Sequence, residues 1–162
     1  MRALAFDRPG PIADAPLTLR EVPDPAPAAG ELLLRVRACA VCRTDLQLVT
    51  GDITPRRRPP AVPGHQVVGT VEALGGGVDG WAIGDRAGAT WLAGFDGTCR
   101  FCREGRENLC PEATFNGWDR DGGYAEAMTV RADVAVHLPP GFDDLAAAPL
   151  LCGGVIGFRA LR

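Results

Sequence analysis

The sequence is poor in histidine, in aromatic residues and in net charge, and it has no long apolar run. No stretch approaches the roughly 20 apolar residues that a membrane helix needs, and Asp7 and Arg8 interrupt the apolar N-terminus before it could serve as a secretion signal. A net charge of −3 provides no basic surface for nucleic acid. We therefore expect a cytoplasmic protein that binds neither membranes nor nucleic acid.

Cysteine is the reactive residue that the chain does have, in six copies. In the reducing cytoplasm these thiols should not form disulfides, and thiols at regular spacing then indicate metal binding.

The 21 glycines and 14 prolines separate short apolar segments, a pattern typical of an irregular β domain with tight turns. No alternation of strands and helices, as in a parallel sheet, is visible, so we predict a barrel or sandwich. The expected strands are 4–6, 17–22, 31–38, 66–74, 85–90, 124–130 and 134–138. Residues 143–161 are rich in Ala and Leu and predict one or two helices, which run to Arg162 without a stop signal and so look like a truncation.

Cys99-x2-Cys102-x7-Cys110 is the sharpest local motif. Two thiols two residues apart can hold one tetrahedral ion from a tight turn, and the third returns after a short loop. Asp96, three residues before Cys99, is the candidate for the fourth ligand, although a carboxylate is a harder ligand than a thiolate. Thiols without a metal, or a redox pair, are the alternatives. With four protein ligands the site would be closed and structural.

Cys42 follows a predicted strand, and His65 precedes another. Since the chain has only two histidines, His65 is a candidate metal ligand, with a hydrogen-bonded core histidine as the alternative. His137, before two prolines, is interpreted as structural or surface.

Six segments taken together are similar, in order, to one known family. They are Cys42-Arg43-Thr44-Asp45, 64–71 (Gly-His-Gln-Val-Val-Gly-Thr-Val), Gly84-Asp85-Arg86, the lobe 96–110, 121–126 (Asp-Gly-Gly-Tyr-Ala-Glu) and 148–152 (Ala-Pro-Leu-Leu-Cys). The chain resembles the GroES-like catalytic domain of the zinc-dependent alcohol dehydrogenases, in the medium-chain dehydrogenase/reductase family. The resemblance implies a mainly β, irregular barrel with flanking helices over residues 1–162, with a structural-zinc lobe at about 94–112.

The same resemblance implies two zinc ions. Cys42, His65 and Cys152 match the ligands of the catalytic zinc, which keeps one position open, and the Asp96 to Cys110 lobe matches the structural site. Thr44 matches the hydroxyl residue that hydrogen-bonds the substrate oxygen, and Asp45 the carboxylate that orients the zinc-bound histidine. A helix cap or turn is the alternative role for Asp45.

Further residues have weaker assignments. Arg43 matches a position that contacts the cofactor pyrophosphate in several members, with a solvated arginine as the alternative. Trp91, Trp118 and Ile53 would line the substrate pocket, although a large aromatic residue is more often core. Cys39 is interpreted as a buried thiol that binds no metal.

The family pattern is broken at three positions. Gln66 replaces a glutamate near the catalytic zinc, which could change zinc exchange and turnover. Gln47 replaces the histidine that many members carry at the outer end of the proton relay, and it cannot titrate near neutral pH. Asp96 replaces the first cysteine of the lobe, which puts the strength of that site in question.

The expected reaction is reversible oxidation of small alcohols to aldehydes or ketones with hydride transfer to NAD or NADP. The cofactor would be bound mainly by a Rossmann domain, whose Gly-x-Gly-x-x-Gly turn does not occur in these residues, so we expect this polypeptide alone to be inactive. The full-length protein is expected to be a homodimer or homotetramer. The alternatives are a polyol or other zinc-dependent dehydrogenase, or a non-catalytic zinc-binding interaction module.

Overall fold

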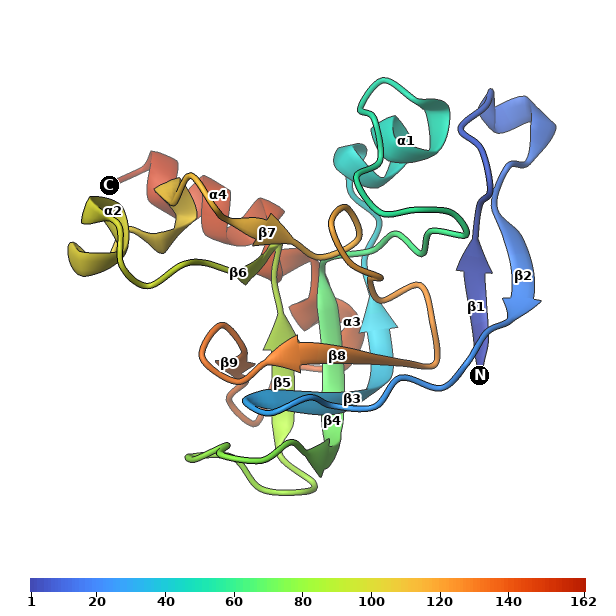
Figure 1. The fold of residues 1–162 in the computed structure, drawn as a ribbon. Coiled ribbons are helices and arrows are strands. Elements are labelled where there is room, and N and C mark those ends of the chain that lie inside the picture. Colours follow the sequence, from blue (N-terminus) through green and yellow to red (C-terminus); the bar gives the residue numbers. More distant parts are fainter.

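The computed structural model, which describes all 162 residues, is built around a five-stranded antiparallel sheet of order β8-β3-β4-β5-β9 (Figure 1). Its strands are β3 (Glu31–Cys39), β4 (Val67–Leu74), β5 (Arg86–Ala89), β8 (Ala127–Arg131) and β9 (Val136–His137). Two smaller sheets pair β1 (Arg2–Ala5) with β2 (Thr18–Glu21) and β6 (Leu92–Gly94) with β7 (Thr114–Phe115). The prediction of a mainly β domain is confirmed, although β6 and β7 were not foreseen.

Alternation of side chains across the central sheet produces the main core. Leu32 and Leu34 on β3 are fully buried, and they pack with Val71 of β4 and Val130 of β8 in one apolar cluster. Successive side chains of a strand point to opposite faces, so this spacing of two places one apolar row inside. The β3–β4 register shifts twice along the pair. Such bulges increase the local twist, which helps the sheet to curl.

Four helices and three short 3-10 turns complete the chain. They are α1 (Arg43–Thr50), α2 (Arg100–Arg103), α3 (Asp144–Ala147) and α4 (Gly153–Ala160), with 3-10 turns at Ile12–Asp14, Glu107–Leu109 and Ala148–Leu151. The helical prediction for 143–161 is confirmed. Helix α1 was not among the predicted elements, although a helix cap was the alternative role given to Asp45.

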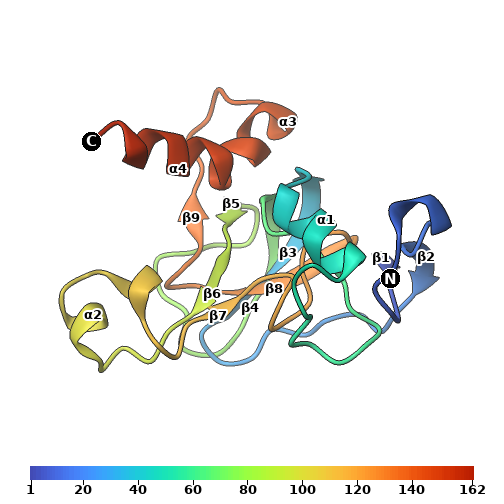
Figure 2. The ribbon, with the colours of Figure 1, turned by 90° about the horizontal axis from the view of Figure 1, so that it is seen from above.

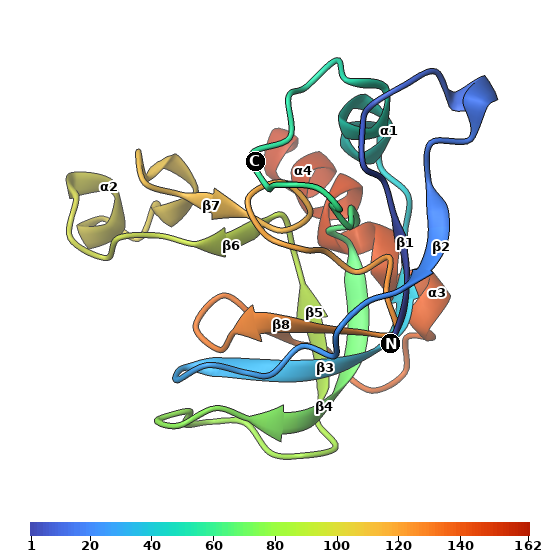
Figure 3. The same ribbon diagram turned by 45° about the vertical axis from the view of Figure 1, so that its right-hand side comes forward.

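The elements are arranged so that segments distant in sequence meet at one side of the sheet. Figure 2 shows α3 and α4 together beyond β5 and β9, with α1 apart from them beside β3. Figure 3 shows the β6–β7 hairpin carrying α2 away from the sheet, on the side opposite to β1 and β2. None of the helices combines the length and apolarity that crossing a bilayer requires.

Candidate functional site

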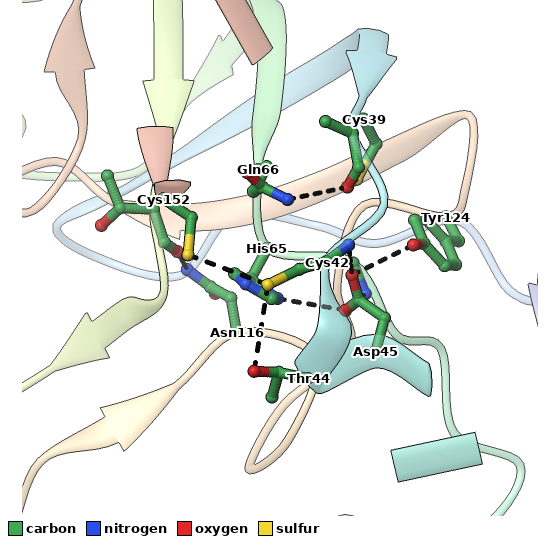
Figure 4. Close-up of polar contacts among 12 residues, drawn as sticks. Cys39, Cys42, Thr44, Asp45, His65, Gln66, Asn116, Tyr124 and Cys152 are labelled. Carbon is green, nitrogen blue, oxygen red and sulfur yellow. Dashed lines mark hydrogen bonds and ion pairs between the residues drawn. The ribbon is translucent and has the colours of Figure 1, made fainter. Parts of the chain in front are cut away.

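Cys42, His65 and Cys152 meet in one cluster (Figure 4). One ligand atom of each lies within 4.8 Å of the others, and the two sulfurs are 4.0 Å apart. Cys42 is the N-cap of α1, His65 stands just before β4, and Cys152 lies between the last 3-10 turn and α4. The fold therefore brings together two cysteines that are 110 positions apart in the sequence.

Asp45 organises this cluster from the third position of α1. Its side chain is 2% exposed and accepts hydrogen bonds from the Cys42 N–H at 2.8 Å, the Gly64 N–H at 3.1 Å and the Tyr124 hydroxyl at 3.1 Å. His65 Nδ1 lies 3.1 Å from Asp45 Oδ1. Because a carboxylate only accepts, Nδ1 carries the proton and Nε2 remains available as a ligand. Asp45 thus caps α1 and orients His65 at once.

The electrostatics of the cluster differ between its two thiols. Burial raises the pKa of Cys42, but the Thr44 N–H and His65 outweigh it, so that this pKa is lowered. Burial and the neighbouring Cys42 raise the pKa of Cys152 to about 11. For His65, burial lowers the pKa but the Asp45 hydrogen bond and charge outweigh this effect, leaving it raised.

The donor set fits a zinc ion. Two sulfurs and one imidazole nitrogen suit borderline-soft Zn²⁺. Two sulfurs bound at about 2.3 Å in tetrahedral geometry lie roughly 3.8 Å apart, close to the 4.0 Å between Cys42 and Cys152. The cluster has three members and not four. Three protein ligands leave a coordination position for water or substrate, as catalytic zinc sites do.

The residues next to the cluster take up distinct positions. Thr44 places its hydroxyl 3.9 Å from Cys42 Sγ, whereas Arg43 is exposed at the start of α1. Gln66 is buried, and its Nε2 donates to the Ala40 carbonyl at 3.3 Å. This hydrogen bond ties the amide to the segment between β3 and Cys42.

Asp96, Cys99, Cys102 and Cys110 form a second cluster in the lobe. The sulfurs of Cys99 and Cys102 are 3.5 Å apart, and Cys110 Sγ lies 3.3 Å from Asp96 Oδ2. Asp96 Oδ1 accepts from the backbone N–H groups of Cys99 at 2.8 Å and Thr98 at 2.6 Å, which hold its pKa well below the usual range. The carboxylate is thus ionised and directs its second oxygen at the thiols, as a fourth ligand would.

An aromatic wall (Trp91, Phe115 and Trp118) flanks His65. The Trp91 ring stacks on Phe115 at 5.0 Å and on Trp118 at 5.7 Å, and meets the His65 ring edge-on at 4.8 Å. The sequence pointed to Trp91 and Trp118, but not to Phe115. Ile53 lies outside this wall, half-buried in the turn after α1, where its N–H donates to the Gln47 carbonyl.

Cys39 and His137, neither of which was expected to bind metal, lie outside both clusters. Burial raises the pKa of the Cys39 thiol to about 12. His137 stacks on Trp81 at 3.6 Å, and its Nε2 lies 3.1 Å from the Gly80 carbonyl oxygen. Tyr124, by contrast, contacts Asp45, and Asn116 binds the backbone around Trp91. Neither residue was assigned a role from the sequence, although Tyr124 lies in the quoted segment 121–126.

Comparison with known proteins agrees with this geometry. The profile of the alcohol dehydrogenase GroES-like domain matches residues 28–140. The probable alcohol dehydrogenase AdhA of Mycobacterium tuberculosis is 49% identical over 99% of this chain and 48% of its own length. The chain therefore spans about half the length of the curated relatives it matches.

Solved structures give the same result. A cobalt- and zinc-bound thermostable alcohol dehydrogenase from Pyrobaculum aerophilum has a TM-score of 0.87 at 34% identity, over 99% of this chain and 48% of that one. A putative zinc-binding dehydrogenase from Sinorhizobium meliloti, bound to NADP, has a TM-score of 0.79 at 32% identity, over 91% of this chain and 41% of that one. With this match, and with two clusters whose donor sets suit zinc, the chain belongs to the zinc-type alcohol dehydrogenase family, in its GroES-like domain.

Proposed function

We propose that residues 1–162 are the zinc-binding catalytic domain of an enzyme that interconverts alcohols with aldehydes or ketones, using NAD or NADP. The observation that carries the proposal is the meeting of Cys42, His65 and Cys152 with no fourth protein ligand. A site used only for stability would be closed by a fourth residue, as the lobe cluster is.

Each residue around the first cluster has a role in this reaction. Cys42, His65 and Cys152 would hold the ion, and zinc supplies a Lewis acid that favours ionisation of an alcohol and polarises a carbonyl group. The Thr44 hydroxyl, beside Cys42, hydrogen-bonds the substrate oxygen and takes up its proton. Asp45 holds His65 in the tautomer that binds metal.

The proton taken up by Thr44 must then leave along a path different from that of the many family members that carry a histidine at the position of Gln47. Gln47 lies one turn after Arg43 on α1 and does not titrate near neutral pH. The proton from Thr44 therefore leaves through water or cofactor hydroxyls. Alcohol oxidation should depend differently on pH from that of members with a histidine there.

Arg43 and the lobe have roles outside the first cluster. Arg43 is exposed, and the structure records no hydrogen bond or ion pair of its guanidinium, so it is free to contact a cofactor pyrophosphate. The NADP-bound relative supports a nicotinamide cofactor held mainly by the half of the enzyme that these residues do not match. Asp96, with the three lobe cysteines, binds a structural zinc. The enzyme acts in the cytoplasm, and its homodimer or homotetramer forms through the other half.

Zinc content tests the metal sites. We expect two zinc ions per chain by elemental analysis of protein purified without added metal, and one each in Cys42→Ser and Cys99→Ser. Each variant controls for the other, since both remove one thiol from a different cluster. A folded, fully reduced protein without zinc would overturn the proposal.

Turnover tests the activity. The complete reading frame that contains residues 1–162 should reduce NAD or NADP in the presence of small alcohols, and Cys42→Ser should abolish this while Cys99→Ser retains zinc at the first cluster. A zinc-replete protein with no alcohol-dependent turnover would instead support the interaction module. A strong preference for polyols would support the other dehydrogenase branch.

A further inference from the structure

Asn116 follows β7 and is fully buried beside the aromatic wall. Its side-chain Nδ2 donates to the Thr90 carbonyl at 2.8 Å and, at a longer 3.5 Å, to the Leu92 carbonyl. Its backbone N–H donates to the carbonyl of Trp91 at 2.9 Å. One residue therefore binds three successive carbonyl groups, with that of Trp91 in the middle.

The amide orientation is determined by these partners, because only the NH2 group can donate to two carbonyl oxygens. Asn116 Oδ1 then has no hydrogen-bond partner although it is buried. Leaving a buried acceptor unpaired is unfavourable, so a side chain that merely filled this space would be apolar. The reason for an amide at this position is its pair of hydrogen bonds to the Thr90 and Leu92 carbonyls, on either side of Trp91.

The residues next to Asn116 also contact Trp91 and the segment before His65. Phe115 and Trp118 both stack on Trp91. Gly117 lies so close to the segment before His65 that a Cβ atom would stand 3.0 Å from the Gly64 nitrogen. The segment 115–118 thus contacts both the Trp91 ring and the chain that carries His65.

We propose that Asn116 is a positioning residue that holds the Trp91 ring against His65, and thereby limits the size of molecules that reach the open metal position. This inference rests on the proposed function, because it assumes a metal at Cys42, His65 and Cys152. Asn116 contacts neither metal nor substrate, and acts only through the backbone of residues 90–92. Its loss lets the ring move away from the histidine.

Cobalt-substituted protein provides the test, since visible absorption of cobalt bound to thiolates responds to an added ligand. The probes are imidazole and the larger 4-phenylimidazole, and the measured quantity is the ratio of their dissociation constants. Asn116→Leu keeps the shape of the side chain but removes its donors, and Asn116→Ser is the milder variant if the first does not fold. Asn108→Leu, the same change at an exposed side chain, is the matched control.

We expect the ratio to shift by roughly fivefold in favour of 4-phenylimidazole, the size of one lost hydrogen bond. Trp91→Ala should shift the ratio in the same direction, and Asn116→Leu should add nothing in that background, as a double-mutant cycle shows for residues that act through one another. Asn108→Leu should leave the ratio unchanged.

An unchanged ratio in both Asn116 variants, or an equal shift with and without Trp91, would overturn the positioning role and assign Asn116 to general stability. Protein that binds no cobalt at the first cluster would overturn the proposed function itself. In that case near-ultraviolet circular dichroism still reports on the wall, and an Asn116→Leu spectrum identical to the parent would also contradict the inference.

Discussion

Gly64 shows how one backbone position can support the whole cluster of Cys42, His65 and Cys152. Gly64 precedes His65 and has a φ of 102°, which residues with a side chain rarely adopt. Its N–H donates to Asp45. A Cβ atom there would lie 2.6 Å from the Tyr124 ring and 2.9 Å from the Cys39 sulfur. Conformation and space both require glycine, because the backbone angle is one that other residues rarely adopt and a Cβ would overlap Tyr124 and Cys39.

Gly64→Ala should therefore lower the free energy of unfolding by about 3 kcal/mol, from backbone strain together with overpacking. Urea denaturation measures the change. Gly76→Ala is the control, since a Cβ there meets nothing within 4 Å and the backbone angle is ordinary, and it should change stability by less than about 0.5 kcal/mol. Equal effects of the two substitutions would contradict this explanation.

Asp45 is the other residue on which the cluster depends, because it receives donors from α1, from the His65 segment and from Tyr124. In Asp45→Asn, the single remaining acceptor oxygen cannot serve all of them. Zinc affinity at the first cluster should fall roughly 10- to 100-fold, measured by competition with a chromophoric chelator. Asp79→Asn, the same change at an exposed side chain, should leave the affinity unaltered. An Asp45→Asn affinity equal to the parent's would show that His65 needs no such partner.

At the scale of elements, α1 forms because local and distant contacts agree. The capping box of Cys42 and Asp45 starts the helix, Gly51 ends it at φ 89°, and Leu48 and Val49 are buried beneath it. The same helix start provides both Cys42, the proposed metal ligand, and the carboxylate that hydrogen-bonds His65. If Cys42 binds the metal, local folding of α1 is coupled to metal binding.

An ion pair adds to the backbone hydrogen bonds that hold the N-terminal strand to the segment before β8. Glu126 accepts from the Arg2 backbone N–H at 2.8 Å and from the Arg2 guanidinium at 2.6 Å. These contacts lower the pKa of Glu126, the backbone N–H being the larger cause. A carboxylate with a lowered folded pKa contributes stability above its unfolded pKa of about 4.3, and loses it as the pH falls through the folded pKa.

Glu126→Gln should therefore reduce stability at about pH 7, and the difference from the parent should shrink as the pH falls below about 4. Urea midpoints of both proteins across this range measure it. Glu112→Gln, at an exposed side chain, is the control. A difference in urea midpoint that stays constant with pH would mean that the charge of Glu126 does not contribute to stability.

Over the whole molecule, the cluster of Cys42, His65 and Cys152 joins the C-terminal helices to the barrel. Cys152 follows a 3-10 turn whose Leu151 packs in a small cluster with Val68, and Arg86 bonds Asp144 at 2.9 Å. Helix α4 beyond it has no buried residue. The region therefore depends on few contacts, and a metal that binds Cys152 would add an important one.

Removal of metal with a chelator should accordingly speed amide hydrogen exchange in residues 143–160 and in α1, while β3 and β4 keep their protection. Hydrogen-exchange mass spectrometry of zinc-loaded and metal-free protein measures this. Cys42→Ser should show the same change without chelator, and Cys99→Ser should show it only in the lobe. Loss of protection spread evenly over the sheet would indicate that the barrel itself needs zinc.

The sequence alone determined the features that short-range patterns encode. The four residues of the lobe cluster lie within fifteen positions, so that spacing and tight turns suffice to bring them together. The β character and the C-terminal helices follow from local composition. Cys152 could be placed beside Cys42 only through the family resemblance, because no spacing rule links residues so far apart.

Only the tertiary structure decided the rest. The several donors to Asp45, the stacking of Phe115 on Trp91 and the hydrogen bonds of Asn116 all join segments that are remote in the sequence. Strands β6 and β7 are only three and two residues long, too short for a sequence pattern to predict, and they form by pairing with each other. Such features depend on which segments the fold places side by side, and local patterns of residues in the sequence do not specify those long-range contacts.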